Sequence, residues 1–127
     1  MFGSDMSQVV EIPADSFRRT VDGSYKPVIV EFWIKSCSNC QKFRPIYEKL
    51  PEIFGDNAEF LKMNMFLALD NLKLAEGLGV EETPTIILFC KGREIGQIIG
   101  YRSLDDVVRE IEEILQRERY CQGQKMR

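Results

Sequence analysis

The stretch Phe32-Trp33-Ile34-Lys35-Ser36-Cys37-Ser38-Asn39-Cys40 decides how this chain is interpreted. It joins an apolar run, residues 28–33, to a segment with helical periodicity, and two cysteines three positions apart stand at the junction. The first N–H groups of a helix lack partners within the helix, and its dipole places partial positive charge there. Both effects stabilise a thiolate, the reactive form of cysteine. We therefore expect Cys37 and Cys40 to form a redox-active pair.

Composition indicates a single soluble domain. The chain has 127 residues, of which 44% are hydrophobic, enough for one core. We expect a single domain over residues 1–127, with its core over about 9–116 and flexible ends at 1–7 and 118–127. Lys and Arg are scattered and the net charge is −3, so no nucleic-acid partner is expected. No apolar run approaches the ~20 residues of a membrane helix. The N-terminus lacks signal-peptide features, which predicts a cytoplasmic protein, and we expect a monomer.

The chain has four cysteines and no histidine. Without histidine, Cys-His and Ser-His catalysis and every His-containing metal site are excluded. Half of a zinc site remains an alternative for Cys37 and Cys40, but the missing ligands would have to come from Cys90, Cys121 or carboxylates. Cys90 lies in an apolar run and is interpreted as a small core residue, while Cys121 stands alone in the tail. We favour redox chemistry, with no metal and no bound cofactor.

The remaining chain alternates between strand and helix patterns. Strands are expected over residues 8–12, 28–33, 58–63, 85–90 and 94–99. Helices are expected over 17–21 with Asp15 or Ser16 as cap, from Cys37 to about 54 with a kink at Pro45, over 70–78, and from 104 onward with Ser103 as cap. The order β-α-β-α-β-α-β-β-α predicts an α/β fold, a mixed central β-sheet flanked by helices. Strands separated by helices should be parallel, and a hairpin at residues 91–92 should add an antiparallel edge.

Taken together and in this order, these motifs resemble the thioredoxin family over about residues 9–116. The matching motifs are the strand ending Glu31-Phe32-Trp33, Cys37-x-x-Cys40, Pro45, Lys62-Met63-Asn64, Gly79-Val80, Thr83-Pro84-Thr85, Lys91-Gly92 and Gly100. The resemblance implies the thioredoxin fold and a thiol-disulfide oxidoreductase that acts on protein disulfides. It also implies that Cys37 is the nucleophile, that Cys40 resolves the mixed disulfide, and that a disulfide reductase or other dithiol donor regenerates the pair.

Glu31 is a carboxylate within an otherwise apolar strand. Its side chain either faces water or lies buried beneath the dithiol, where burial would raise its pKa and let it carry a proton near neutral pH. The resemblance implies the buried position and proton exchange with Cys40, although thioredoxins usually have Asp there. It also implies that Lys62 lies near the carboxylate, whereas the residues alone fit an exposed strand lysine equally well.

We expect a substrate site around the dithiol, as the resemblance implies, formed by Trp33, Ser36, Ser38, Asn39, Thr83 and Pro84. An X-Pro bond is usually trans, so the sequence alone predicts an ordinary turn at Thr83-Pro84. The resemblance instead implies a cis bond packed against the dithiol, with the backbone of Thr83 free to pair with an extended substrate.

Three residues around Cys37 depart from the family pattern. Ser36 stands where thioredoxins usually have Trp, and Ser38-Asn39 stands where they usually have Gly-Pro. Because Asn39 has a backbone N–H that Pro lacks, the Cys37 thiolate gains a donor, and we expect a more oxidising pair. A thioredoxin-like binding module with weak redox turnover remains the alternative function, since these replacements surround the chemistry.

Overall fold

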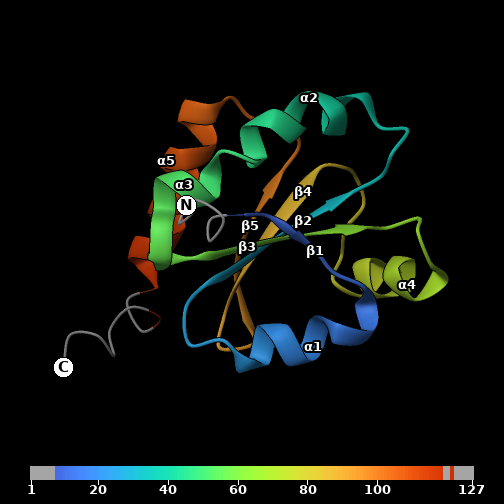
Figure 1. Ribbon diagram of the computed structural model, residues 1–127, viewed down its shortest axis with the longest axis horizontal. Helices are drawn as coiled ribbons and strands as arrows, with labels where there is room; N and C mark the ends of the chain where they lie inside the picture. Colours follow the sequence, from blue (N-terminus) through green and yellow to red (C-terminus); the bar gives the residue numbers. More distant parts are fainter. Residues whose placement is uncertain (1–7, 119–120, 122–127) are drawn as a thin grey trace, which may run out of the picture.

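A five-stranded mixed sheet forms the centre of the computed structural model, which describes residues 8–118 and Cys121 (Figure 1). The strands lie in the order β1-β3-β2-β4-β5. Their bounds are β1 Val10–Glu11, β2 Val28–Trp33, β3 Glu59–Asn64, β4 Thr85–Cys90 and β5 Arg93–Ile99. The strand β3 is parallel to both β1 and β2, whereas β4 is antiparallel to β2 and β5 to β4. This arrangement is the mixed sheet expected from the sequence.

Helices cover both faces of the sheet (Figure 1). One face carries α1 (Ala14–Gly23) and α4 (Leu69–Gly77), and the other carries α2 (Ser38–Tyr47), α3 (Leu50–Phe54) and α5 (Leu104–Arg117), with a short 3₁₀ turn, η2 (Gly55–Asn57), before β3. Because both faces are covered, the side chains of β4 are buried along its whole length and those of β2 along all but its last residue. This explains why both strands are nearly continuous apolar runs in the sequence.

The expected elements are present, but several boundaries differ. The first strand is shorter than 8–12, and α1 begins at Ala14 after Pro13 with no side-chain cap, so Asp15 and Ser16 lie inside its first turn. The single kinked helix expected after Cys37 is instead two helices. Pro45 has no N–H for the Gln41 carbonyl. Beyond the end of α2, the Lys49 N–H donates to the Ile46 carbonyl at 3.1 Å, a bond over three residues in place of the helical four. The cap expected from Ser103 at α5 is confirmed.

The direction of β4 corrects the expectation that strands separated by helices are parallel. In β2, Phe32 pairs with Met63 at the end of β3 and with Thr85 at the start of β4. The chain therefore leaves β3 and enters β4 at the same end of the sheet, because α4 does not carry it back along the strands. The consequence is functional, since the residues just before Thr85 lie beside the residues that follow β2. The expected hairpin then joins β4 to β5, with positive φ at Lys91 (53°) and Gly92 (83°).

A disulfide between Cys90 and Cys121 is a second correction. The two buried residues have Cα atoms 5.7 Å apart and join the end of β4 to the chain after α5. Cys90 is therefore not a free core thiol, and Cys121 neither stands alone nor belongs to a flexible end. The other residues predicted to be flexible, apart from Glu118, lie outside the described residues.

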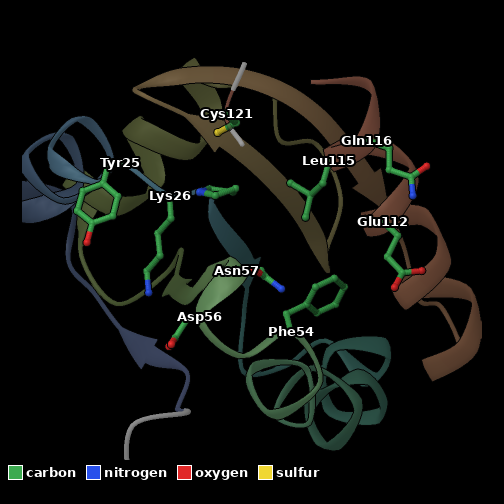
Figure 2. A pocket seen from close by; sticks show the side chains of 10 residues that line it. Tyr25, Lys26, Phe54, Asp56, Asn57, Glu112, Leu115, Gln116 and Cys121 are labelled. Carbon is green, nitrogen blue, oxygen red and sulfur yellow. The ribbon is translucent and has the colours of Figure 1, made fainter. Parts of the chain in front are cut away.

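The disulfide borders a cavity of about 910 Å³ at the end of the sheet opposite Cys37. Figure 2 shows side chains from the loop before β2, from the end of α3 and from α5 around this hollow, with Cys121 at its edge. None of the residues expected to carry chemistry lines it. Among the described residues, no helix is both long and apolar enough to cross a membrane.

Candidate active site

Cys37 and Cys40 are free thiols at the start of α2. Cys37 is the N-cap of the helix, and its Sγ accepts a hydrogen bond from the Cys40 N–H at 3.1 Å. The Cys37 thiol also lies 3.4 Å from the Thr83 carbonyl oxygen, to which it donates. Cys37 is partly exposed, whereas only 4% of Cys40 is accessible. The pair therefore has one sulfur open to a substrate and one held behind it.

The two thiols have pKa values shifted in opposite directions. Partial burial acts to raise the pKa of Cys37, but hydrogen bonds with the side chains of Cys40 and Thr83 and from the backbone N–H groups of Cys40 and Asn39 outweigh it, so the pKa is lowered. Burial, with the hydrogen bond to Cys37 acting in the same direction, raises the pKa of Cys40 to about 11. At neutral pH Cys37 is thus the better nucleophile, and Cys40 needs a base before it can attack.

The other predicted residues on this loop surround Cys37. Ser36, Ser38 and Asn39 are exposed at the start of α2, where an incoming protein would meet them. The backbone N–H of Asn39 helps to lower the pKa of Cys37, as expected from the absence of proline. Trp33 is half-buried at the end of β2.

Glu31 lies in a cavity behind the dithiol. It is only 4% exposed, so its side chain does not face water at the surface. A cavity of about 610 Å³ is lined by Glu31, Trp33, Lys35, Cys40, Gln41, Arg44 and Lys62. Burial raises the pKa of Glu31 to about 8, while the charge of Lys62 partly lowers it and nearby carboxylates raise it further. The carboxyl and the resolving thiol therefore share one cavity, with a carboxyl that titrates close to physiological pH.

Lys62 on β3 lines this cavity, and Glu11 on β1 contacts Trp33, another of its lining residues. Lys62 pairs in register with Glu31, and its ammonium lies 5.4 Å from the centre of the Trp33 ring. The Trp33 indole N–H donates to Glu11 at 3.2 Å, and the second oxygen of Glu11 accepts from the Asn64 N–H at 2.7 Å. Glu11 was missed from the sequence, because only the pairing of β1 with β3 brings it to Trp33.

The Thr83–Pro84 peptide bond is cis, as the resemblance implied. Pro84 is buried and Thr83 is partly exposed, with its carbonyl turned toward Cys37. The turn is fastened on its other side by Thr85, whose hydroxyl donates to the Glu82 carbonyl at 2.6 Å. The described residues contain no group of three His, Cys, Asp or Glu side chains arranged to hold a metal ion.

Known proteins share this arrangement. The thioredoxin family model matches residues 8–113. This chain belongs to the thioredoxin family. It is 31% identical to a thioredoxin of Alicyclobacillus acidocaldarius over 80% of this chain and 92% of that protein, and 32% identical to one of Mycolicibacterium smegmatis over 88% and 99%. Thioredoxin F from spinach chloroplast has a similar structure, with a TM-score of 0.76 and 28% identity over 85% of this chain and 94% of that one.

Part of a longer relative matches as well. Protein disulfide isomerase-like 2-2 of rice (Oryza sativa subsp. japonica) is 37% identical over 93% of this chain, which covers 32% of that protein. Both groups of relatives are disulfide oxidoreductases. This thioredoxin-family protein is accordingly a thiol-disulfide oxidoreductase, and protein disulfides are the substrates on which thioredoxins act.

Replacing Glu31 with glutamine should slow the attack of Cys40 on the mixed disulfide by about 100-fold. Glutamine keeps the shape of the side chain but cannot accept the Cys40 proton. Because the pKa of Glu31 is about 8, the resolution rate of the unchanged protein should rise with pH and level off above that value, whereas the variant should lack this inflection. Stopped-flow reduction of a protein disulfide between about pH 6 and 9 measures both rates.

The matched control is Glu48→Gln, which removes another carboxylate that raises the Glu31 pKa but lies on an exposed side chain. Glu48→Gln should keep the inflection.

The stability of Glu31→Gln, compared with that of the unchanged protein, provides a second readout. A carboxyl with a raised pKa costs stability as pH rises from its unfolded value of 4.5 through about 8, so Glu31→Gln should lose less stability over that window. Equal resolution rates for Glu31→Gln and the unchanged protein would remove Glu31 from the mechanism.

Proposed function

We propose that this protein reduces disulfides of other proteins and is regenerated by a disulfide reductase or another dithiol donor. The observation that carries the proposal is the opposed pair of sulfurs: Cys37 with a lowered pKa beside the Thr83 carbonyl, and Cys40 with a raised pKa behind it. An extended substrate segment pairs with the backbone at Thr83 and brings its disulfide to Cys37.

The reaction proceeds in two exchanges. The Cys37 thiolate attacks one substrate sulfur, the substrate S–S bond breaks, and the second substrate sulfur leaves as a thiolate that takes up a proton. Glu31 then accepts the proton of Cys40, whose thiolate attacks the Cys37 sulfur and releases the first substrate sulfur. Two electrons pass to the substrate, and the protein is left with a Cys37–Cys40 disulfide. The external dithiol returns it to the reduced form, so the protein works as an electron carrier.

Reduction of insulin by dithiothreitol, followed by precipitation of the freed B chain, tests this proposal. We expect the protein to accelerate precipitation catalytically, at concentrations far below that of insulin. A thioredoxin-like binding module with weak turnover would act only stoichiometrically. Catalytic amounts that leave the rate at the dithiothreitol background would overturn the proposal in favour of that alternative.

Asn39→Pro should make the pair more reducing by about 20–30 mV. Proline removes the backbone N–H that helps lower the pKa of Cys37, so the thiolate and with it the reduced state lose one donor. Equilibration against glutathione buffers measures the potential. Ser38→Gly, which restores the other family residue but keeps this N–H, is the control and should move the potential less. An unchanged or more oxidising potential in Asn39→Pro would contradict this account of the donor.

We further propose a monomer that acts in the cytoplasm. The Cys90–Cys121 disulfide makes the location testable, because structural disulfides persist mainly in oxidising compartments. Cells quenched in acid and labelled with a thiol reagent report whether these two cysteines are oxidised in place. Reduced Cys90 and Cys121 support the cytoplasm, and a fully oxidised pair supports an oxidising compartment instead.

A further inference from the structure

A groove of about 530 Å³ leads away from the reacting sulfur along the loop between β3 and α4. It begins at Thr83, whose carbonyl accepts the hydrogen bond of Cys37, so it is continuous with the active site. Its walls are apolar and acidic, formed by Ile34, Met65, Phe66, Leu72, Val80, Glu76, Glu81 and Glu82 together with Gly79 and Thr83.

The loop between β3 and α4, together with the first residue of α4, holds large apolar side chains in solvent beside this groove. Phe66 is 64% exposed, Leu67 is 68% exposed and Leu69 is 64% exposed. The backbone beneath them is fixed: the Phe66 N–H donates to Asn64 Oδ1 at 3.1 Å, the Leu67 N–H donates to the Asn64 carbonyl at 3.2 Å, and the Asn71 amide donates to the same carbonyl at 2.9 Å. A fixed loop with its apolar side chains turned outward does not stabilise the fold, and such patches mark interaction sites.

Three carboxylates also line the groove. Glu76, Glu81 and Glu82 are exposed, and none of them takes part in an ion pair among the described residues. Glu82 Oε2 and the Arg102 guanidinium both approach Gly100, so the charge of Glu82 is partly offset. Glu76 and Glu81 are therefore the carboxylates that set the charge of the groove, and they would repel phosphates and other anions.

We propose that this groove selects protein substrates in which apolar and basic residues flank the disulfide. The apolar residue packs against Phe66 and Met65, and a Lys or Arg side chain faces Glu76 and Glu81. The inference deepens the proposed function, on which it rests, because the segment that enters the groove is the one whose sulfur meets Cys37. Apolar contact supplies affinity, and the complementary charge supplies partner choice and faster encounter.

The test uses three disulfide-linked peptide dimers that are symmetric about cysteine, so that chain direction does not matter. They are Lys-Leu-Cys-Leu-Lys, Glu-Leu-Cys-Leu-Glu and Lys-Ser-Cys-Ser-Lys. With the reduced full-length protein at low salt, kcat/KM for the first should exceed that for the second by about three- to tenfold. The ratio should fall toward one at high salt, because exposed charges are screened. The third peptide should also be reduced more slowly than the first, mainly through a higher KM.

Two double variants with the same net charge separate this groove from general electrostatics. Glu76→Gln with Glu81→Gln should lose the preference for the basic over the acidic peptide. Glu52→Gln with Glu112→Gln, on α3 and on α5, should keep it. Phe66→Ser should reduce the preference for the Leu peptide over the Ser peptide. Equal kcat/KM for the basic and acidic peptides, or loss of the preference only in the distal double variant, would overturn the proposal.

A binding readout distinguishes this proposal from the redox function. NMR titration of the Cys37→Ser, Cys40→Ser protein with the peptides, their cysteines replaced by serine, should shift the amides of Phe66 and Glu81 most with Lys-Leu-Ser-Leu-Lys. If those shifts occur while no dimer is reduced, the groove stands and the proposed function fails. If all dimers are reduced alike and the amides do not shift, the function stands and the groove proposal fails.

Discussion

Cys37→Ser should lower the catalysed reduction of insulin to the rate of dithiothreitol alone. Cys37 is the only free thiol of the described residues that is more than slightly exposed, and the hydrogen bonds at the start of α2 lower its pKa. A serine hydroxyl does not form a comparable nucleophile at neutral pH, but it is a good N-cap, so the start of α2 should remain intact. Insulin turnover, with the melting temperature as a check of folding, measures the effect.

The comparison with Cys40→Ser sharpens this prediction. That variant keeps the nucleophile and lacks only the resolving thiol, so it should react once with a substrate and then stop. The two variants therefore both lose turnover but differ in whether the first bond forms. Turnover that survives in a folded Cys37→Ser protein would mean that another group attacks the substrate.

Replacing both Cys90 and Cys121 with alanine should lower the free energy of unfolding by about 3–4 kcal/mol, because the disulfide closes a loop across a sequence separation of 31 residues. The cross-link restricts the unfolded chain, and in the folded chain it fastens the segment after α5 to the end of β4. The double replacement avoids leaving one reactive thiol. Thermal unfolding should show a fall of about 10–15 °C in the melting temperature.

The control for this prediction is the Cys37→Ser, Cys40→Ser protein, which has the same number of cysteines removed but keeps the Cys90–Cys121 bond. Dithiothreitol at a concentration that reduces the Cys90–Cys121 bond should lower the melting temperature of this control protein as well. The disulfide is at the end of β4, whereas Cys37 follows the end of β2 that pairs with the start of β4, so insulin reduction by the double alanine variant at 25 °C should be retained. Equal melting temperatures for the double alanine variant and the unchanged protein would contradict a stabilising role.

Features that depend on residues close together in the sequence could be predicted from it. The strands β2 and β4 are nearly continuous apolar runs because both faces of each are covered. Ser103 marks the start of α5 because its hydroxyl oxygen accepts a local hydrogen bond from the Asp106 N–H. The dithiol could be predicted because its chemistry depends only on Cys37, Cys40 and the N-terminus of α2.

Features that depend on distant contacts could not be predicted in this way. Apolar periodicity carries no strand direction, so the antiparallel pairing of β4 with β2 was missed. The disulfide was missed because the residues before Cys121 show no apolar period that would place them against β4. The exposed Phe66 loop is likewise invisible in composition, since its orientation is set by hydrogen bonds to Asn64. For Glu31, the strand alone fits either an exposed or a buried side chain, and only the resemblance implies burial. Its raised pKa reflects burial and also charges on neighbouring elements that the sequence does not place beside it.

Intact-mass measurement of the reduced Cys40→Ser protein after exposure to oxidised insulin tests the central claim most directly. We predict a single covalent adduct, a mixed disulfide whose protein half maps to the peptide containing Cys37, and its release on addition of dithiothreitol. An adduct at Cys90 or Cys121, or no adduct while insulin is still reduced, would contradict thiol-disulfide exchange through Cys37.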